Sequence, residues 1–174
     1  MTITATTKLA EAKKLYLSAF PKEELLPWWV LRLMTLPKGA AITSYYTGDD
    51  FCGFTHTTIT DEVVYVMFFA VQDELRGQGY GSAILEYLKQ DNPGKPIILN
   101  VEPLDERAEN AQQRIERLRF YEKNGFYDTG YNIKEVGGTF RILSTDPILK
   151  PQSYLRAFHK LSLGLWSPRI TAVK

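Results

Sequence analysis

The chain has 174 residues, 44% of them hydrophobic and 24% charged, and 21 Lys and Arg against 20 Asp and Glu give a net charge of +1. This composition is typical of a globular protein that builds one core. A net charge near zero argues against a broad electrostatic surface for nucleic acid. The longest apolar run, Val63 to Val71, is far shorter than the roughly 20 residues that a membrane helix needs.

Two features bear on the cellular compartment. Cys52 is the single cysteine, which excludes an intrachain disulfide and is typical of a reducing compartment. The first residues, MTIT, show no basic region followed by an apolar stretch, so no signal peptide is expected. We therefore expect a cytoplasmic protein without a membrane partner.

The first part of the chain predicts two helices and then three strands. Thr6 or Thr7 is suited to cap a helix whose apolar residues recur at helical spacing up to Phe20. Pro27 suits the first position of a second helix, 27–36, which is apolar nearly all round. Apolar and Thr-rich runs separated by tight turns then predict an antiparallel meander of strands 40–47, 51–60 and 63–71.

The second part predicts a helix after residue 80, which Asn92-Pro93-Gly94 ends, and then further strands and helices. The predicted elements are a strand at 96–101, a charged helix at 107–123, a hairpin of 126–136 and 139–144, and a tail helix near 152–163. Gly137-Gly138 suits a type I′ turn in this hairpin. A helix between two strands of one sheet implies a parallel crossover.

Residues 76–82, RGQGYGS, join the most apolar strand to a helix. The first N–H groups of a helix lack internal partners, and the helix dipole places partial positive charge there. Glycines allow a ligand to approach such a backbone closely. The spacing is neither that of a P-loop nor that of a dinucleotide fingerprint. We expect a phosphate-bearing ligand here, although three glycines also suit a simple tight connection.

Two stretches resemble the GNAT superfamily of acyl-CoA-dependent N-acyltransferases. Arg76 to Gly81 (RGQGYG) is similar to its Q/R-x-x-G-x-G/A signature, and Phe120 to Phe126 (FYEKNGF) resembles its Y-x-x-x-G-F helix end. The resemblance implies an α/β fold with a mixed, mostly antiparallel, splayed sheet of six or seven strands flanked by helices. It implies a single acyltransferase domain over 1–146, and a tail, 147–174, whose extra helix packs on that domain or on a partner subunit.

The resemblance also implies a coenzyme site. The implied contacts with coenzyme A come from Phe69, Ala70, Val71, Arg76, Gly77, Gln78, Gly79, Tyr80, Gly81 and Ser82. The backbone at 69–71 would pair with the pantetheine arm, and an N–H there would polarise the thioester carbonyl. Tyr121 corresponds to the family's general acid. Arg114 and Arg117 stand where many members have Asn and Ala, so the Asn contact with pantetheine is not carried over.

A primary alkyl amine has a pKa of about 10.4, so the reaction also requires loss of a proton from the acceptor. Glu102, at the end of a strand that should diverge from Val63–Val71, is our first candidate base, ahead of Glu62 and His56. A water relay and desolvation of the amine remain alternatives. We expect His159 to be structural. We expect Glu23 and Glu24 to be solvated.

Trp28 and Trp29 suit either core packing or an aromatic wall of the acceptor pocket, where they would hold an ammonium. The implied function is an N-acetyltransferase that moves an acetyl group from acetyl-CoA to a small-molecule or peptide amine. The amine would attack the thioester directly, because nothing near Cys52 indicates an activated thiol. No metal is expected. The alternatives are a non-catalytic acyl-CoA-binding or regulatory module and a nucleotide-phosphate binder. A homodimer is left open.

Overall fold

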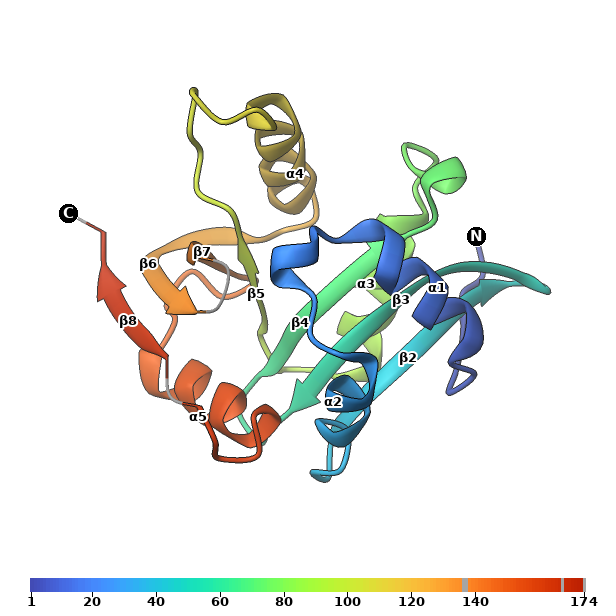
Figure 1. The fold of residues 1–174 in the computed structure, drawn as a ribbon, viewed down its shortest axis with the longest axis horizontal. Coiled ribbons are helices and arrows are strands. Elements are labelled where there is room, and N and C mark those ends of the chain that lie inside the picture. Colours follow the sequence, from blue (N-terminus) through green and yellow to red (C-terminus); the bar gives the residue numbers. More distant parts are fainter. Residues whose placement is uncertain (136–137, 167, 174) are drawn as a thin grey trace.

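The computed structural model describes residues 1–135, 138–166 and 168–173, which form one sheet flanked by helices (Figure 1). The helices are α1 (Ala10–Ala19), α2 (Trp28–Leu33), α3 (Tyr80–Asp91), α4 (Ala111–Lys123) and α5 (Pro151–Leu161). The strands are β1 (Thr4–Thr6), β2 (Ala40–Thr47), β3 (Asp50–Ile59), β4 (Val64–Val71), β5 (Ile97–Val101), β6 (Tyr127–Glu135), β7 (Gly138–Ser144) and β8 (Arg169–Ala172). Two short 3-10 helices, η1 (Lys22–Glu24) and η2 (Asp73–Leu75), lie in the connections.

The sheet has eight strands in the order β1-β2-β3-β4-β5-β7-β6-β8. The β4–β5 pair is parallel and the other neighbours are antiparallel, which confirms the mixed, mostly antiparallel sheet and the meander of β2, β3 and β4. The predicted number of six or seven strands was too small. The additional strands, β1 and β8, lie at the two edges and span three and four residues. Such short, polar segments carry too little alternation to be recognised in a sequence.

The sheet opens in its middle, between β4 and β5. Their parallel pairing joins Val64–Val66 to Ile97–Leu99, and β4 then continues to Val71 without β5 beside it. The register of β4 against β3 skips Met67 at this same point. A bulge bends a strand and increases its twist, so Met67 marks where the two strands diverge. The predicted splay is therefore present.

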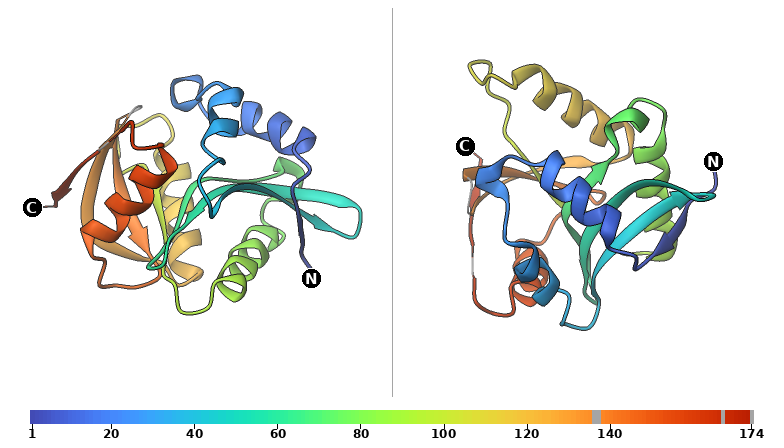
Figure 2. Two further views of the ribbon diagram at one scale, coloured as in Figure 1. Left: turned by 90° about the horizontal axis from the view of Figure 1, so that it is seen from below. Right: turned by 45° about the vertical axis from the view of Figure 1, so that its right-hand side comes forward.

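Helices cover both faces of the sheet (Figure 2). On one face, α1, α2 and α5 bury the side chains of Tyr65 and Phe68 from β4. On the other face, α3 and α4 bury Val64 and Val66. The central strands are thus apolar on both sides, as a continuous apolar run predicts. The predicted tail helix packs on the sheet: Tyr154, Ala157, Phe158 and Leu161 of α5 are all buried there.

Several predicted boundaries were wrong. Thr6 lies in β1, and α1 begins at Ala10 after Leu9 without a side-chain cap. Pro27 is the N-cap of α2, which ends at Leu33 rather than residue 36. Helix α4 begins at Ala111 instead of residue 107, because turns occupy the intervening segment. The predicted type I′ turn at Gly137-Gly138 falls partly outside the described residues.

Across the ranges that the structure describes, we find no helix with the length and the apolar character to cross a membrane.

Candidate functional site

The glycine-rich loop has the backbone geometry that its sequence indicated. Gly77 and Gly79 adopt φ of +73° and +88°, in the left-handed region that favours glycine. Gly79 is the N-cap of α3, and no side chain caps this helix. A Cβ atom added at either glycine would meet no atom within 4 Å, so both face open space. The loop therefore presents bare backbone to solvent at the start of a helix.

The N–H groups of residues 77–82 are available for a ligand. Within the described chain none of them donates a hydrogen bond, and the first paired amide of the helix is that of Ala83, which donates to the Gly79 carbonyl at 3.0 Å. A run of unpaired N–H groups at a helix N-terminus is an anion site. These residues therefore fit a pyrophosphate group, and their part in binding one stays a prediction.

Two polar side chains of the loop turn back toward η2. The Arg76 guanidinium pairs with Asp73 at 2.6 Å, and both side chains are more than half exposed. The Gln78 side-chain amide donates to the Glu74 carbonyl at 2.6 Å. A surface pair of this kind is weak, so Arg76 can exchange Asp73 for a phosphate at little cost.

The last residues of β4 have an open hydrogen-bonding edge. Gln72 N–H donates to the Cys52 carbonyl at 2.9 Å. Antiparallel strands alternate between paired and outward-facing residues, so the N–H and C=O groups of Phe69 and Val71 point away from β3. On that side β5 has already diverged, and no described strand pairs with this stretch. The geometry fits an added extended chain such as a pantetheine arm.

Tyr121 lies on α4 against the same region. Its ring packs against Phe120 and Phe126, with centroids 5.1 and 5.4 Å away, and Phe120 in turn lies beside Phe69 of β4. Within the described chain, no hydrogen bond of its hydroxyl is found. Burial raises the pKa of Tyr121 to about 12, and the charge of Arg117 opposes this rise. The hydroxyl is therefore protonated at neutral pH and has its proton to donate.

Glu102, the predicted base, lies at the end of β5 in an ion-pair cluster. Arg114 approaches one carboxylate oxygen at 2.9 Å and Arg117 the other at 2.8 Å. The Asn110 amide donates to both oxygens at 3.1 and 3.2 Å. Each carboxylate oxygen of Glu102 is thus engaged by one guanidinium and by the Asn110 amide. The role of Glu102 as the base stays a prediction, and these contacts favour a different one.

The other candidate residues lie apart from the loop. His56 is fully buried in β3, stacked on Phe68, and neither ring nitrogen has a partner among the described residues. Burial lowers its pKa to about 4. Glu62 accepts hydrogen bonds from Arg156 of α5, and these lower its pKa. His159 is exposed on α5.

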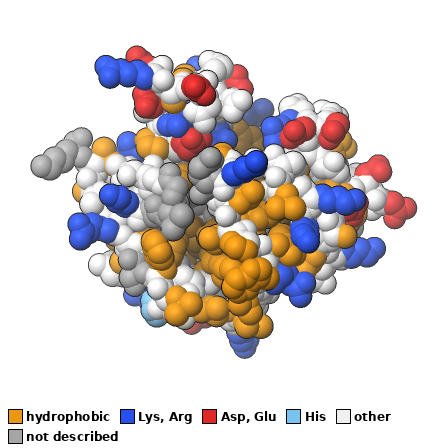
Figure 3. Space-filling model, viewed as in Figure 1, with side chains coloured by type: hydrophobic (Ala, Val, Ile, Leu, Met, Phe, Trp, Pro, Cys, Tyr) orange, Lys and Arg blue, Asp and Glu red, His pale blue; other side chains and the backbone are white. Residues whose placement is uncertain are grey.

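The two tryptophans differ. Trp28 packs against Tyr16, with ring centroids 5.8 Å apart, and belongs to the core under α1. Trp29 is 65% exposed, and its neighbours Leu33 and Leu36 are also exposed. Apolar side chains gather on the face of the molecule that carries α2 (Figure 3). The core-packing interpretation thus holds for Trp28 and not for Trp29.

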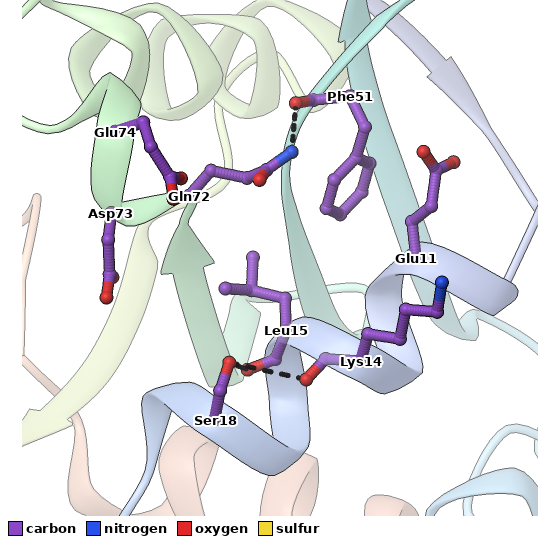
Figure 4. Close-up of a pocket in the computed structure, with 8 residues that line it drawn as sticks. All are labelled: Glu11, Lys14, Leu15, Ser18, Phe51, Gln72, Asp73 and Glu74. Carbon is purple, nitrogen blue, oxygen red and sulfur yellow. Dashed lines mark hydrogen bonds between the residues drawn. The ribbon is translucent and has the colours of Figure 1, made fainter.

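A pocket of about 490 Å3 was not predicted from the sequence. It lies between α1 and the connection from β4 to α3 (Figure 4). Its lining residues are Glu11, Lys14, Leu15, Ser18, Phe51, Gln72, Asp73 and Glu74. The polar residues of α1 that line it have the spacing of an ordinary solvated helix face, so the sequence held no signal for a pocket. Its charged lining residues are Glu11, Lys14, Asp73 and Glu74; the Tyr46 hydroxyl donates to Glu11, and Arg76 pairs with Asp73.

Comparison with known proteins agrees with this geometry. Residues 38–128 match the family described as the acetyltransferase (GNAT) domain. The chain belongs to the GNAT acetyltransferase family. This match covers more than half of the chain and includes the loop, β4 and Tyr121. It confirms the family that the two sequence motifs indicated.

Individual relatives share about a third or less of their aligned residues with this chain. YjbC of Bacillus subtilis (strain 168), whose name describes it as a putative acetyltransferase, is 31% identical over 109 residues, or 63% of this chain and 47% of YjbC. The chain thus matches about half the length of this curated relative. A GNAT-family structure from Bacteroides thetaiotaomicron has 24% identity and a TM-score of 0.72, covering 95% of this chain and 100% of that one.

A structure of aminoglycoside 6′-N-acetyltransferase complexed with coenzyme A has 15% identity and a TM-score of 0.63, covering 87% of this chain and 99% of that one. Naa50 of Arabidopsis thaliana, complexed with the bisubstrate analogue CoA-Ac-MVNAL, has 19% identity and a TM-score of 0.59, with 83% and 98% covered. These likenesses confirm the GNAT fold.

Proposed function

We propose that this protein is an N-acetyltransferase that moves an acetyl group from acetyl-CoA to a primary amine. The observation that carries the proposal is the succession of three features of the described chain: the unpaired N–H groups of 77–82, the open edge of β4 at 69–71, and the hydroxyl of Tyr121, for which no hydrogen bond is found. A pyrophosphate, a pantetheine arm and a thioester follow one another in the same order along acetyl-CoA. Family membership supports this proposal.

In the proposed reaction, the lone pair of a neutral amine attacks the thioester carbonyl carbon. Outward-facing N–H groups at Phe69 or Val71 polarise the carbonyl and stabilise the oxyanion. The C–S bond then breaks, its electron pair stays on sulfur, and the Tyr121 hydroxyl gives its proton to the thiolate. The nitrogen loses a proton to a water relay, because Glu102, the base that the sequence predicted, is engaged by Arg114 and Arg117.

The names of structural relatives support an amine acceptor. One acts on an aminoglycoside at a 6′-nitrogen, and another is complexed with an analogue that joins coenzyme A to a peptide. We therefore propose that the acceptor is a small-molecule or peptide amine. We propose also that 1–146 forms the acyltransferase unit and that the tail, 147–174, completes its sheet and core.

The first test is calorimetric titration with acetyl-CoA. We expect micromolar binding by the wild type and loss of binding by Gly79→Trp, because the indole would cover the exposed amides. Gly94→Trp is the matched control, since Gly94 has a similar φ of +77° and open space but lies beyond the other end of α3. Absence of binding by folded wild type would refute the proposal. Equal binding by adenosine diphosphate would favour a nucleotide-phosphate binder.

The second test separates an enzyme from a non-catalytic acyl-CoA sensor. Tyr121→Phe should keep the affinity for acetyl-CoA and lose turnover by a factor of about 10²–10⁴, the usual contribution of a general acid. Tyr127→Phe is the control, because Tyr127 is 52% exposed and lies outside the site. Turnover that survives Tyr121→Phe unchanged would contradict the assigned acid.

A further inference from the structure

A cluster of charged side chains joins the end of β5 to α4 beside Tyr121. Arg114 is fully engaged there: its Nε donates to Asn110 at 2.7 Å, one terminal nitrogen donates to the Pro103 carbonyl at 2.9 Å, and the other pairs with Glu102 at 2.9 Å. The side chains of Arg114 and Glu102 are only 18% and 19% exposed. This part of the cluster is therefore a fixed support for Glu102.

Arg117 differs from Arg114 in its surroundings. It pairs with Glu102 through one terminal nitrogen at 2.8 Å, and its side chain is 45% exposed. Its other N–H groups donate to no group in the described chain. Residues four apart on a helix share a face, so Arg117 lies one turn before Tyr121 on the same side of α4. Glu102 thus holds a half-exposed guanidinium next to the proposed acid.

The charge of the cluster does not cancel. Two guanidiniums face one carboxylate, which leaves a net charge of +1. The elements packed around Tyr121 contribute apolar side chains to its cluster. These apolar side chains come from α3, β4, β5 and β7, and from Phe126 before β6. The charge of Arg117, one helical turn before Tyr121, lowers the pKa of the Tyr121 hydroxyl and opposes the effect of burial.

We propose that Arg117, aligned by Glu102, is a positioning residue that acts through the Tyr121 hydroxyl to stabilise the departing thiolate of coenzyme A. This inference rests on the proposed function. When the C–S bond breaks, sulfur keeps the electron pair and Tyr121 donates its proton. A buried tyrosinate would then form in an apolar surrounding, and the cation of Arg117 offsets that cost until the proton lost by the amine is returned. In this arrangement Glu102 orients Arg117 and is not the base.

The test compares the affinities of coenzyme A and acetyl-CoA, measured by calorimetry at pH 6.5 and pH 9.0. Acetyl-CoA has no free thiol, so the ratio of the coenzyme A affinity to the acetyl-CoA affinity reports the contribution of the thiol to binding. If the site lowers the pKa of the bound thiol by one unit from about 8.5, the ratio rises roughly sevenfold between these pH values. Arg117→Gln and Tyr121→Phe should each reduce this rise in the affinity ratio to less than twofold. The double variant should show no further reduction beyond that of either single variant.

Two further variants serve as controls. Arg119→Gln removes an exposed charge from the same helix and should keep the wild-type rise. Arg117→Lys keeps the charge and should retain part of the rise. If neither ligand binds to the wild type, the proposed function fails and this inference fails with it. If both bind with a ratio that does not change with pH, the inference is overturned while the proposed function stands. Equal weakening of both ligands by Arg117→Gln at each pH would show a merely structural role.

Discussion

His56 makes a quantitative prediction about acid stability. Burial among apolar neighbours, without a partner for either ring nitrogen, lowers its pKa in the folded protein from 6.5 to about 4. Between pH 6.5 and pH 4 the unfolded chain therefore binds a proton at His56 that the folded chain does not bind. The free energy of unfolding falls as the pH falls below 6.5. At pH 5.0 the linkage relation gives a loss of about 2 kcal/mol, rising to about 3 kcal/mol below pH 4. Above pH 7.5 His56 contributes no pH dependence.

The assay is urea unfolding at pH 7.5 and pH 5.0, on wild type and on His56→Phe. Phenylalanine retains a ring that can stack on Phe68 and cannot be protonated. Other groups titrate equally in the two proteins, so the wild type should lose about 2 kcal/mol more than His56→Phe between these pH values. His159→Gln replaces the other histidine, which is exposed, and should behave as the wild type. Equal losses in wild type and His56→Phe would refute the argument.

Two further stability predictions follow from buried contacts. The Tyr45 hydroxyl lies 2.9 Å from that of Thr55 in a buried pair, so Tyr45→Phe should cost about 1–2 kcal/mol in chemical denaturation, and adding Thr55→Val should cost much less than its own separate effect. A Cβ at Gly81 would lie 3.0 Å from the Phe120 ring, so Gly81→Val should cost about 1–3 kcal/mol in the same assay. Phe120→Leu should relieve most of that cost, and an unchanged cost would contradict the assigned contact.

The sequence predicted those parts of the fold that depend on contiguous residues. The apolar run at Val63–Val71 indicated a central strand, and the structure buries both of its faces. The glycines at 77 and 79 indicated an exposed backbone turn, and both have positive φ. In both stretches the prediction depends only on neighbouring residues: the apolar side chains of the strand and the glycines of the turn. Edge strands β1 and β8 escaped it, because pairing with β2 and β6 orders segments that have little pattern of their own.

The role of Glu102 shows the limit of such reasoning. Its place at the end of a diverging strand predicted that Glu102 faces the cleft and acts as the base. The sequence also showed that Arg114 and Arg117 depart from the family pattern, but it contains nothing that connects these arginines with Glu102. The fold brings them together over 12 and 15 residues of chain, and the arginines engage both carboxylate oxygens. The two arginines of α4 and Glu102 at the end of β5 therefore form a single ion-pair cluster. A substitution at either arginine should be judged by what it does to Glu102 and to Tyr121, as well as by its own contacts.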